Sequence, residues 1–248
     1  MKKFWGFLLV IVLMTSCGEY QSLLKSNDYN LVYKKAIEYY NKGDYQRAMN
    51  LLDGVRSVFV GQAKAQNIAY YRAFCSYNMK DYQIASDLFK QFIQTYPESS
   101  FAEECLYMMG FCDYKASPKP RLDQQVTEKA IREFQLYLSR YPYSMRKDKV
   151  NTYMDEMRDK LSYKAYLSAK NYYLREHYKA AVISLQNCLK DYPGSKYREE
   201  IMYMLFVSKY QMAVNSVEDK KVERYNNARE EYYYFADEYP NSRYAADV

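Results

Sequence analysis

Residues 85–99 read ASDLFKQFIQTYPES, and this stretch decides the fold because variants of it recur along the whole chain. Large apolar residues follow Ala85 after 4, 7 and 11 positions: Phe89, Phe92 and Tyr96. This spacing is the apolar stripe of an amphipathic helix. Pro97 should end that helix, because proline disfavours α geometry in the residue before it. Ser99 then stands where it could cap a following helix.

The same pattern occurs in four other places. The alanines that start it are Ala48, Ala130, Ala181 and Ala228, and the aromatics 11 positions later are Phe59, Tyr141, Tyr192 and Tyr239. Three of these copies also end in Pro-x-Ser, at Pro142, Pro193 and Pro240. Only the first copy departs from this ending, with Val60 and Gly61 in place of proline.

A pair of tyrosines spaced Tyr-x6-Tyr precedes each copy. The pairs are Tyr33/Tyr40, Tyr70/Tyr77, Tyr107/Tyr114, Tyr166/Tyr173 and Tyr203/Tyr210. Seven residues make about two helical turns, so each pair lies on one face of one helix. Three of the four steps between pairs are 37 residues, and the fourth, 59, is 37 plus an insertion of 22. Such a period is typical of stacked helical repeats, which usually bind other chains.

Each unit is therefore expected to form helix A, a short turn and helix B. Small residues stand between most tyrosine pairs, at Ala36, Ala73, Gly110 and Ala169. With the alanine that starts helix B, they resemble the tetratricopeptide repeat. The sequence predicts an all-α, right-handed solenoid of five tetratricopeptide-like helical hairpins in a domain at 29–248. The expected repeats are about 29–60, 62–97, 99–142, 144–193 and 195–240.

The N-terminus has the features of an export signal. Lys2 and Lys3 precede an apolar run that is too short for a stable membrane span, and small residues follow. Cys17 after Thr15 and Ser16 resembles a bacterial lipoprotein lipobox. We expect 1–16 to be cleaved, Cys17 to be lipidated and 17–28 to form a tether, with retention at the periplasmic face of the outer membrane. The alternative is an ordinary cleaved signal with an incidental cysteine.

Composition disfavours several classes of function. The net charge is +6 and falls to +4 without the two signal lysines, which is a mild excess spread along the helices. Nucleic-acid binding would need clustered basic residues, so it is not expected. The chain contains no glycine-rich phosphate loop, GxSxG or HExxH motif. We expect no enzyme activity.

The cysteines and the single histidine suggest no cofactor or metal. Cys75, Cys105, Cys112 and Cys188 fall inside helical patterns and are interpreted as buried small hydrophobes, although Cys75 could find a disulfide partner across helices. There is no CxxC motif, and His177 lies in the turn between helix A and helix B of repeat four.

The order of these parts resembles the BamD family of outer-membrane β-barrel assembly lipoproteins. A lipobox precedes the hairpins, the third hairpin has a long turn over 115–125, and a long helix is expected from about 146 to 175. The resemblance implies a scaffold that binds a BamA-like barrel subunit through repeats four and five, about 146–240. It also implies that repeats one to three receive unfolded outer-membrane protein precursors.

The tyrosine pairs of repeats one to three are candidate residues of a peptide-binding groove: Tyr33, Tyr40, Tyr70, Tyr77, Tyr107 and Tyr114. Tyrosine suits the grip of an extended aromatic peptide, because its ring buries area and its hydroxyl can bond peptide carbonyls. The alternative is that the rings only pack between neighbouring A helices. A generic periplasmic tetratricopeptide adaptor for cell-envelope complexes is the competing function.

Overall fold

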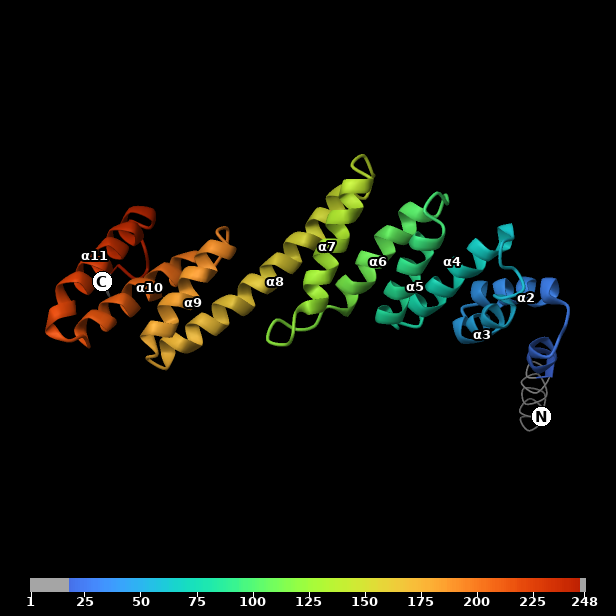
Figure 1. Cartoon of the computed structure of the whole chain (residues 1–248), viewed down its shortest axis with the longest axis horizontal. Helices are drawn as coiled ribbons and strands as arrows, with labels where there is room; N and C mark the ends of the chain where they lie inside the picture. The colour runs from blue at the N-terminus through green and yellow to red at the C-terminus, as the bar shows by residue number, and fades with distance from the viewer. Residues whose placement is uncertain (1–17, 246–248) are drawn as a thin grey trace, which may run out of the picture. The chain divides into compact units, whose positions relative to one another are not determined.

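The structure is a computed structural model that describes residues 18–245. It is helical throughout this range, without a β-strand, and the helices follow one another as hairpins (Figure 1). The described chain divides into two compact units. The first unit holds residues 18–117 and 125–150, and the second holds 118–124 and 151–245.

The first unit contains three successive helix pairs. They are α2 (Tyr29–Asn41) with α3 (Tyr45–Val55), α4 (Ala63–Asn78) with α5 (Tyr82–Thr95), and α6 (Ala102–Ala116) with α7 (Gln125–Arg140). Besides these pairings, α3 packs on α4 and α5 packs on α6, so the core runs from pair to pair.

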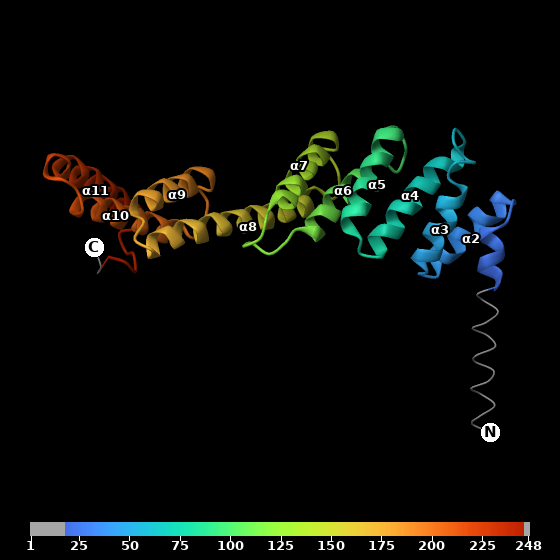
Figure 2. The same cartoon turned by 60° about the horizontal axis from the view of Figure 1, so that its bottom comes forward.

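The second unit continues the same arrangement. It contains most of α8 (Lys147–Leu174), followed by α9 (Tyr178–Asp191), α10 (Arg198–Val214) and α11 (Glu218–Glu238) (Figure 2). Its core joins Tyr166 and Ala169 of α8 to Leu185 of α9 and Leu205 of α10. The next pair, α10 with α11, packs along its length.

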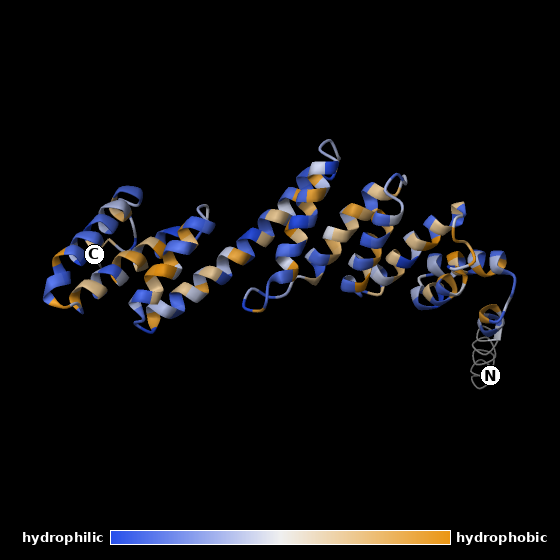
Figure 3. Cartoon of the chain, viewed as in Figure 1, coloured by the Kyte–Doolittle hydropathy of each residue, from blue (hydrophilic) through white to orange (hydrophobic). Residues whose placement is uncertain are grey.

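The stripe expected on each B helix is buried. All five starting alanines are at most 2 % exposed, and so are Phe89, Phe92, Phe134 and Tyr137. The stripe is less buried at its edges: Tyr232 of the last B helix is 37 % exposed, and four of the aromatics 11 positions after the alanine are half-buried, namely Tyr96, Tyr141, Tyr192 and Tyr239. Figure 3 shows apolar residues recurring between polar ones along the ribbons, as expected for amphipathic helices. The all-α fold of consecutive hairpins is confirmed, while the count of five and the right-handed superhelix stay predictions.

The small residues of the A helices allow close helix packing. Ala36, Ala73 and Ala169 are fully buried. At Gly110 a Cβ atom would lie only 2.9 Å from Cδ1 of Phe134, so α6 and α7 approach more closely than an alanine would allow. This close approach explains why glycine stands in the middle of α6, although glycine at such a position lowers the stability of the helix.

Two features of the structure account for the longer, 59-residue step between the tyrosine pairs of the third and fourth repeats. The turn between α6 and α7 covers 117–124, and α8 is 28 residues long. Gln124 Nε2 donates hydrogen bonds to the carbonyls of Lys119 and Leu122, which hold the turn in shape. Lys164 Nζ of α8 donates to the Leu122 carbonyl at 2.9 Å, so the turn is fixed to the long helix.

Candidate functional site

Aromatic side chains form a continuous row on the A helices of the first unit. This aromatic row consists of Tyr40 on α2, Tyr70, Tyr71, Phe74 and Tyr77 on α4, and Tyr107, Phe111 and Tyr114 on α6. Its side chains are half-buried, except for Tyr107, which is 7 % exposed.

Neighbouring rings in the row are in contact from one end to the other. The centroid distances are 4.9 Å for Tyr40–Tyr71, 5.6 Å for Tyr71–Tyr70, 4.5 Å for Tyr70–Phe74, 6.3 Å for Phe74–Tyr77 and 6.2 Å for Tyr77–Phe111. Phe111 also stacks nearly parallel on Tyr107 and Tyr114, at 5.7 and 5.9 Å. These separations are those that aromatic pairs prefer, so the row is a packed surface that still exposes part of most rings.

Five of the six predicted groove tyrosines belong to this row. Tyr33 does not belong: its ring lies 6.1 Å from Phe59 and 5.7 Å from the ammonium of Lys64. Sequence reasoning missed Phe74 and Phe111, although both lie four residues after the first tyrosine of a pair and are themselves 37 residues apart. It also missed Tyr71, which joins Tyr40 to α4.

The first tyrosine of every pair is covered by the residue 16 positions after the helix B alanine. The ring-to-ring or ring-to-cation distances are 5.7 Å for Tyr33 with Lys64, 4.6 Å for Tyr70 with Phe101, 4.9 Å for Tyr107 with Arg146, 4.3 Å for Tyr166 with Tyr197 and 4.3 Å for Tyr203 with Tyr244. These tyrosines therefore help to join one repeat to the next through stacking or cation–π contact.

Two adjacent glutamates stand in the first turn of α6 and two more in the first turn of α10, and both pairs strengthen the contacts between successive repeats. In the first unit, the Tyr70 hydroxyl donates to Glu104 at 2.8 Å, and the Ser144 hydroxyl donates to Glu103 at 2.8 Å. One carboxylate therefore binds the repeat before it and its neighbour binds the repeat after it. The Tyr137 hydroxyl also donates to Glu103, at 3.0 Å.

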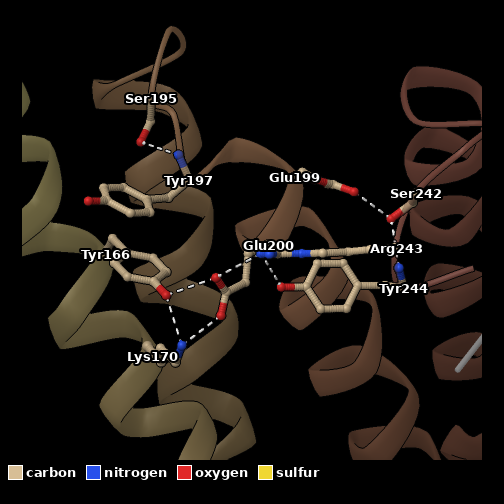
Figure 4. A network of polar contacts seen from close by, with 9 residues as sticks. All are labelled: Tyr166, Lys170, Ser195, Tyr197, Glu199, Glu200, Ser242, Arg243 and Tyr244. Carbon is tan, nitrogen blue, oxygen red and sulfur yellow. Dashed lines mark hydrogen bonds and ion pairs between the residues drawn. The ribbon is translucent and has the colours of Figure 1, made fainter.

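The second unit repeats this arrangement (Figure 4). The Tyr166 hydroxyl donates to Glu200 at 2.9 Å, and the Ser242 hydroxyl donates to Glu199 at 2.7 Å. Lys170 Nζ also donates to Glu200, at 2.7 Å. These acids lie in the first turn of their helices, where they suit the dipole. They also bind side chains from both neighbouring repeats, which their sequence positions alone do not indicate.

These contacts shift the pKa values of their members. Burial raises the pKa of Tyr70, and the bond to Glu104 raises it further, so this hydroxyl stays a donor. Burial alone would raise the pKa of Glu200, but hydrogen bonds from Lys170 and Tyr166 outweigh that effect and lower it. The bond to Glu200 in turn raises the pKa of Lys170.

The serine after each proline acts differently from the expected helix cap. Ser99 Oγ accepts the backbone N–H of Phe101, and Ser195 Oγ accepts that of Tyr197. Phe101 and Tyr197 are themselves the N-cap residues of α6 and α10, and neither has a side-chain cap. The hydroxyl therefore stabilises the tight turn before the helix. The expectation that this serine caps the helix was wrong, because the N-cap residue lies two positions after it.

The last helix pair carries many exposed apolar side chains, which we call the C-terminal patch. They are Tyr210 on α10 and Val222, Tyr225, Tyr232, Tyr233 and Tyr234 on α11, which are 37 to 72 % exposed and lie on more than one side of α11. Tyr210 contacts Tyr225 at 5.9 Å between ring centroids, and Tyr232 contacts Tyr233 at 5.6 Å. Exposed apolar groups of this kind mark surfaces that bind proteins.

The four helical cysteines are buried and free, in line with their interpretation as small hydrophobes. Burial raises the pKa of the Cys75 and Cys105 thiols to about 12 and that of Cys188 to about 11, so the thiolate form is disfavoured. Cys17 lies outside the described residues. No helix within 18–245 is long and apolar enough to cross a membrane.

Comparisons with known proteins add a family assignment. A family model described as YfiO, outer membrane lipoprotein, matches residues 25–200 and, in a second match, 166–248. A search of curated proteins found no match. Among solved structures, one of MamA AMB-1 is 14 % identical, with 82 % of this chain and 90 % of that chain covered and a TM-score of 0.34.

Proposed function

Because the chain belongs to the YfiO family of outer membrane lipoproteins, we propose that it is a lipid-anchored scaffold of the outer-membrane β-barrel assembly machinery. In this proposal, Cys17 carries the acyl chains and the helical repeats face the periplasm. The repeats bind two kinds of partner: a BamA-like barrel subunit and unfolded precursors of outer-membrane proteins. Both the family and the hairpin fold are of a scaffold type and suit protein–protein interaction.

The aromatic row is the observation that carries the proposal for precursor binding. Half-buried rings from three successive A helices give a long surface with fixed ring positions. A chain segment with aromatic side chains could stack on these rings at little entropic cost, because the rings already hold one another in place. The Tyr40 hydroxyl accepts a hydrogen bond from Asn78, so its O–H can donate to a peptide carbonyl of an extended segment.

The C-terminal patch supports a second contact, with the barrel subunit, through repeats four and five. Tyr233 and Tyr234 are 61 and 68 % exposed, and Val222 is 72 % exposed. Tyrosine is among the residues that contribute most to binding when it becomes buried in an interface. We therefore expect a folded partner to cover α11, in contrast to the unfolded partner on the aromatic row.

Co-purification from detergent-solubilised outer membranes tests the assignment. We expect a BamA-type barrel protein to be retained with the wild-type chain and to be lost from a Tyr233→Ala, Tyr234→Ala double variant. A control variant, Tyr143→Ala, removes an exposed tyrosine outside the patch and should retain the barrel protein. Absence of any barrel protein in the wild-type complex, with other envelope proteins in its place, would favour the generic periplasmic adaptor.

Lipid labelling tests the anchor separately. We expect the wild-type chain to incorporate a radiolabelled fatty acid and to fractionate with outer membranes, and Cys17→Ala to do neither. Unchanged membrane association of the Cys17→Ala variant would contradict anchoring by acyl chains.

A further inference from the structure

A pocket of about 410 Å³ lies in the first unit between α4, α5 and the segment that follows α3, and none of its lining residues belongs to the aromatic row. Ala65 and Ala69 of α4 and Leu88 of α5 line it and are half-buried. Val60, which stands where the other repeats carry proline, also lines it and is 74 % exposed. The pocket is therefore an open hollow with small, apolar walls.

An arginine stands on the same face of α4 as the two alanines, since it follows Ala69 by three positions. Arg72 lines the pocket, and its side chain is only 12 % exposed. The residues 37 positions after Ala69 and Arg72 are Leu106 and Met109, and both are buried. Repeat two thus carries a cation where repeat three carries an apolar side chain. Arginine is rarely buried to this degree unless it is paired.

The guanidinium of Arg72 is only partly paired. Its Nε donates to Asp53 Oδ1 at 2.6 Å, whereas Arg198 uses both Nε and Nη2 to bind Glu238. Within residues 18–245, neither terminal nitrogen of Arg72 is among the unpartnered polar atoms that are closed to water. These two nitrogens are therefore open and can donate side by side to a second carboxylate, in the bidentate geometry that arginine favours.

The remaining charges determine the sign of a ligand. Arg56, which follows α3, also lines the pocket and is exposed, so both charged side chains of the lining are cations. Asp53 offsets one of these two charges, and the pocket stays positive. A cationic ligand would be repelled, and phosphate would leave the apolar wall at Leu88 uncovered. A carboxylate on an aliphatic stem satisfies both the cations and the wall.

We propose that this pocket binds an acidic side chain of a partner polypeptide, a glutamate beside an apolar residue, with its carboxylate on the terminal nitrogens of Arg72. The aliphatic stem then passes Val60, and the apolar neighbour packs on Ala69 and Leu88. The exposed amide of Gln91 at the rim can bond the peptide backbone, which favours a polypeptide over a free acid. This inference rests on the pocket alone and holds whether or not the chain serves barrel assembly.

Two peptides that differ by one charge test the carboxylate contact. With the full-length chain in detergent and saturation-transfer NMR as readout, we expect acetyl-Leu-Glu-Leu-amide to bind about tenfold more tightly than acetyl-Leu-Gln-Leu-amide, as hydrogen bonds between charged groups allow. Arg72→Met, which keeps an unbranched apolar stem, should bind both peptides equally. Arg132→Met, which removes an exposed arginine outside this pocket, should keep the tenfold preference.

Equal binding of the two peptides to the wild type, or a preference that survives in Arg72→Met, would overturn the proposal. Should Arg72→Met fail to fold by circular dichroism, Val60→Glu provides a second test from an exposed position. Its carboxylate at the rim repels a second acid, so the glutamate peptide should lose its advantage, whereas the neutral Val60→Gln should keep it. A preference retained in Val60→Glu would place the peptide elsewhere, and the proposal would be wrong.

Two further probes distinguish an acidic side chain from other carboxylates. Butyrate should bind about tenfold more weakly than the glutamate peptide, because it lacks the apolar neighbours and the peptide groups. The peptide acetyl-Leu-Gln-Leu with a free C-terminal carboxylate should bind no more tightly than its amide. Butyrate binding as tight as that of the glutamate peptide would show a site for a free acid, and a preference for the free C-terminus would show a site for a chain end. Either result would overturn the assignment.

Discussion

Tyr166 and Tyr197 stack face to face across a repeat junction, with ring centroids 4.3 Å apart and planes 9° from parallel. The next junction repeats this geometry almost unchanged, since Tyr203 and Tyr244 are 4.3 Å apart at 8°. Each second ring belongs to the residue that follows the Pro-x-Ser turn by two positions. The turn therefore does more than end a helix, because it also places the ring that covers the previous repeat.

We expect Tyr197→Ala to lower the free energy of unfolding of the chain by about 1–3 kcal/mol, since it removes a half-buried ring and its stacking contact with Tyr166. Tyr197→Phe keeps the stacked ring and should change stability by no more than about 0.5 kcal/mol. Urea unfolding followed by circular dichroism measures both. A large loss in Tyr197→Phe would show that the hydroxyl, not the stacking, stabilises the junction.

The Glu200 junction should depend on pH. The folded chain holds the pKa of Glu200 below its ordinary value, so the carboxylate stabilises the fold above an unfolded pKa of about 4.3. This stability is lost as the pH falls through the lower, folded pKa. Glu200→Gln should therefore be less stable than the wild type at pH 7, and the gap should shrink as the pH falls below about 4. Urea midpoints at pH 7, 5, 4 and 3 measure this gap, and a constant gap would contradict the role of the carboxylate.

The sequence predicted the helices well because their signals are local. The spacing around Ala85 and the proline at 97 follow from helix periodicity and proline geometry, and α5 ends at Thr95, two residues before that proline. The long helix expected from about 146 to 175 is α8, Lys147–Leu174. The sequence also assigns the extra 22 residues to a long turn and a long helix.

The contacts between repeats could not be predicted in the same way. Glu103 and Glu104 are adjacent in sequence, yet one binds Ser144 and the other binds Tyr70. Such pairings depend on how one hairpin packs on the next, and helical spacing within a repeat does not encode it. Phe74 and Phe111 are a different case, because they are spaced as regularly as the tyrosines, 37 residues apart, and their spacing would have placed them on the same helix face.

Gly110→Ala should destabilise the first unit despite the better helix propensity of alanine. The new Cβ would lie 2.9 Å from a ring atom of Phe134, which is fully buried and cannot move aside. Overpacking of this kind costs about 1–3 kcal/mol, which exceeds the gain of about 0.5–1 kcal/mol from replacing glycine in a helix. Gly54→Ala is the matched control, because nothing lies within 4 Å of its Cβ position in α3. Thermal unfolding should show a lower Tm for the first variant and an equal or higher Tm for the second.

The aromatic row can be tested for peptide contact with a variant that keeps the first tyrosine of each pair and the residue that covers it. Tyr77 contacts Phe74 and Phe111 within the row, and Tyr77→Ala should weaken binding of a barrel-precursor C-terminal peptide about five- to tenfold in fluorescence anisotropy. Tyr96→Ala is the control, since it also removes a half-buried ring of the first unit, one that packs on Phe92 outside the row. Both variants should lose similar stability, but only Tyr77→Ala should lose affinity. Equal affinity losses would mean that the row stabilises the stack and does not bind the peptide.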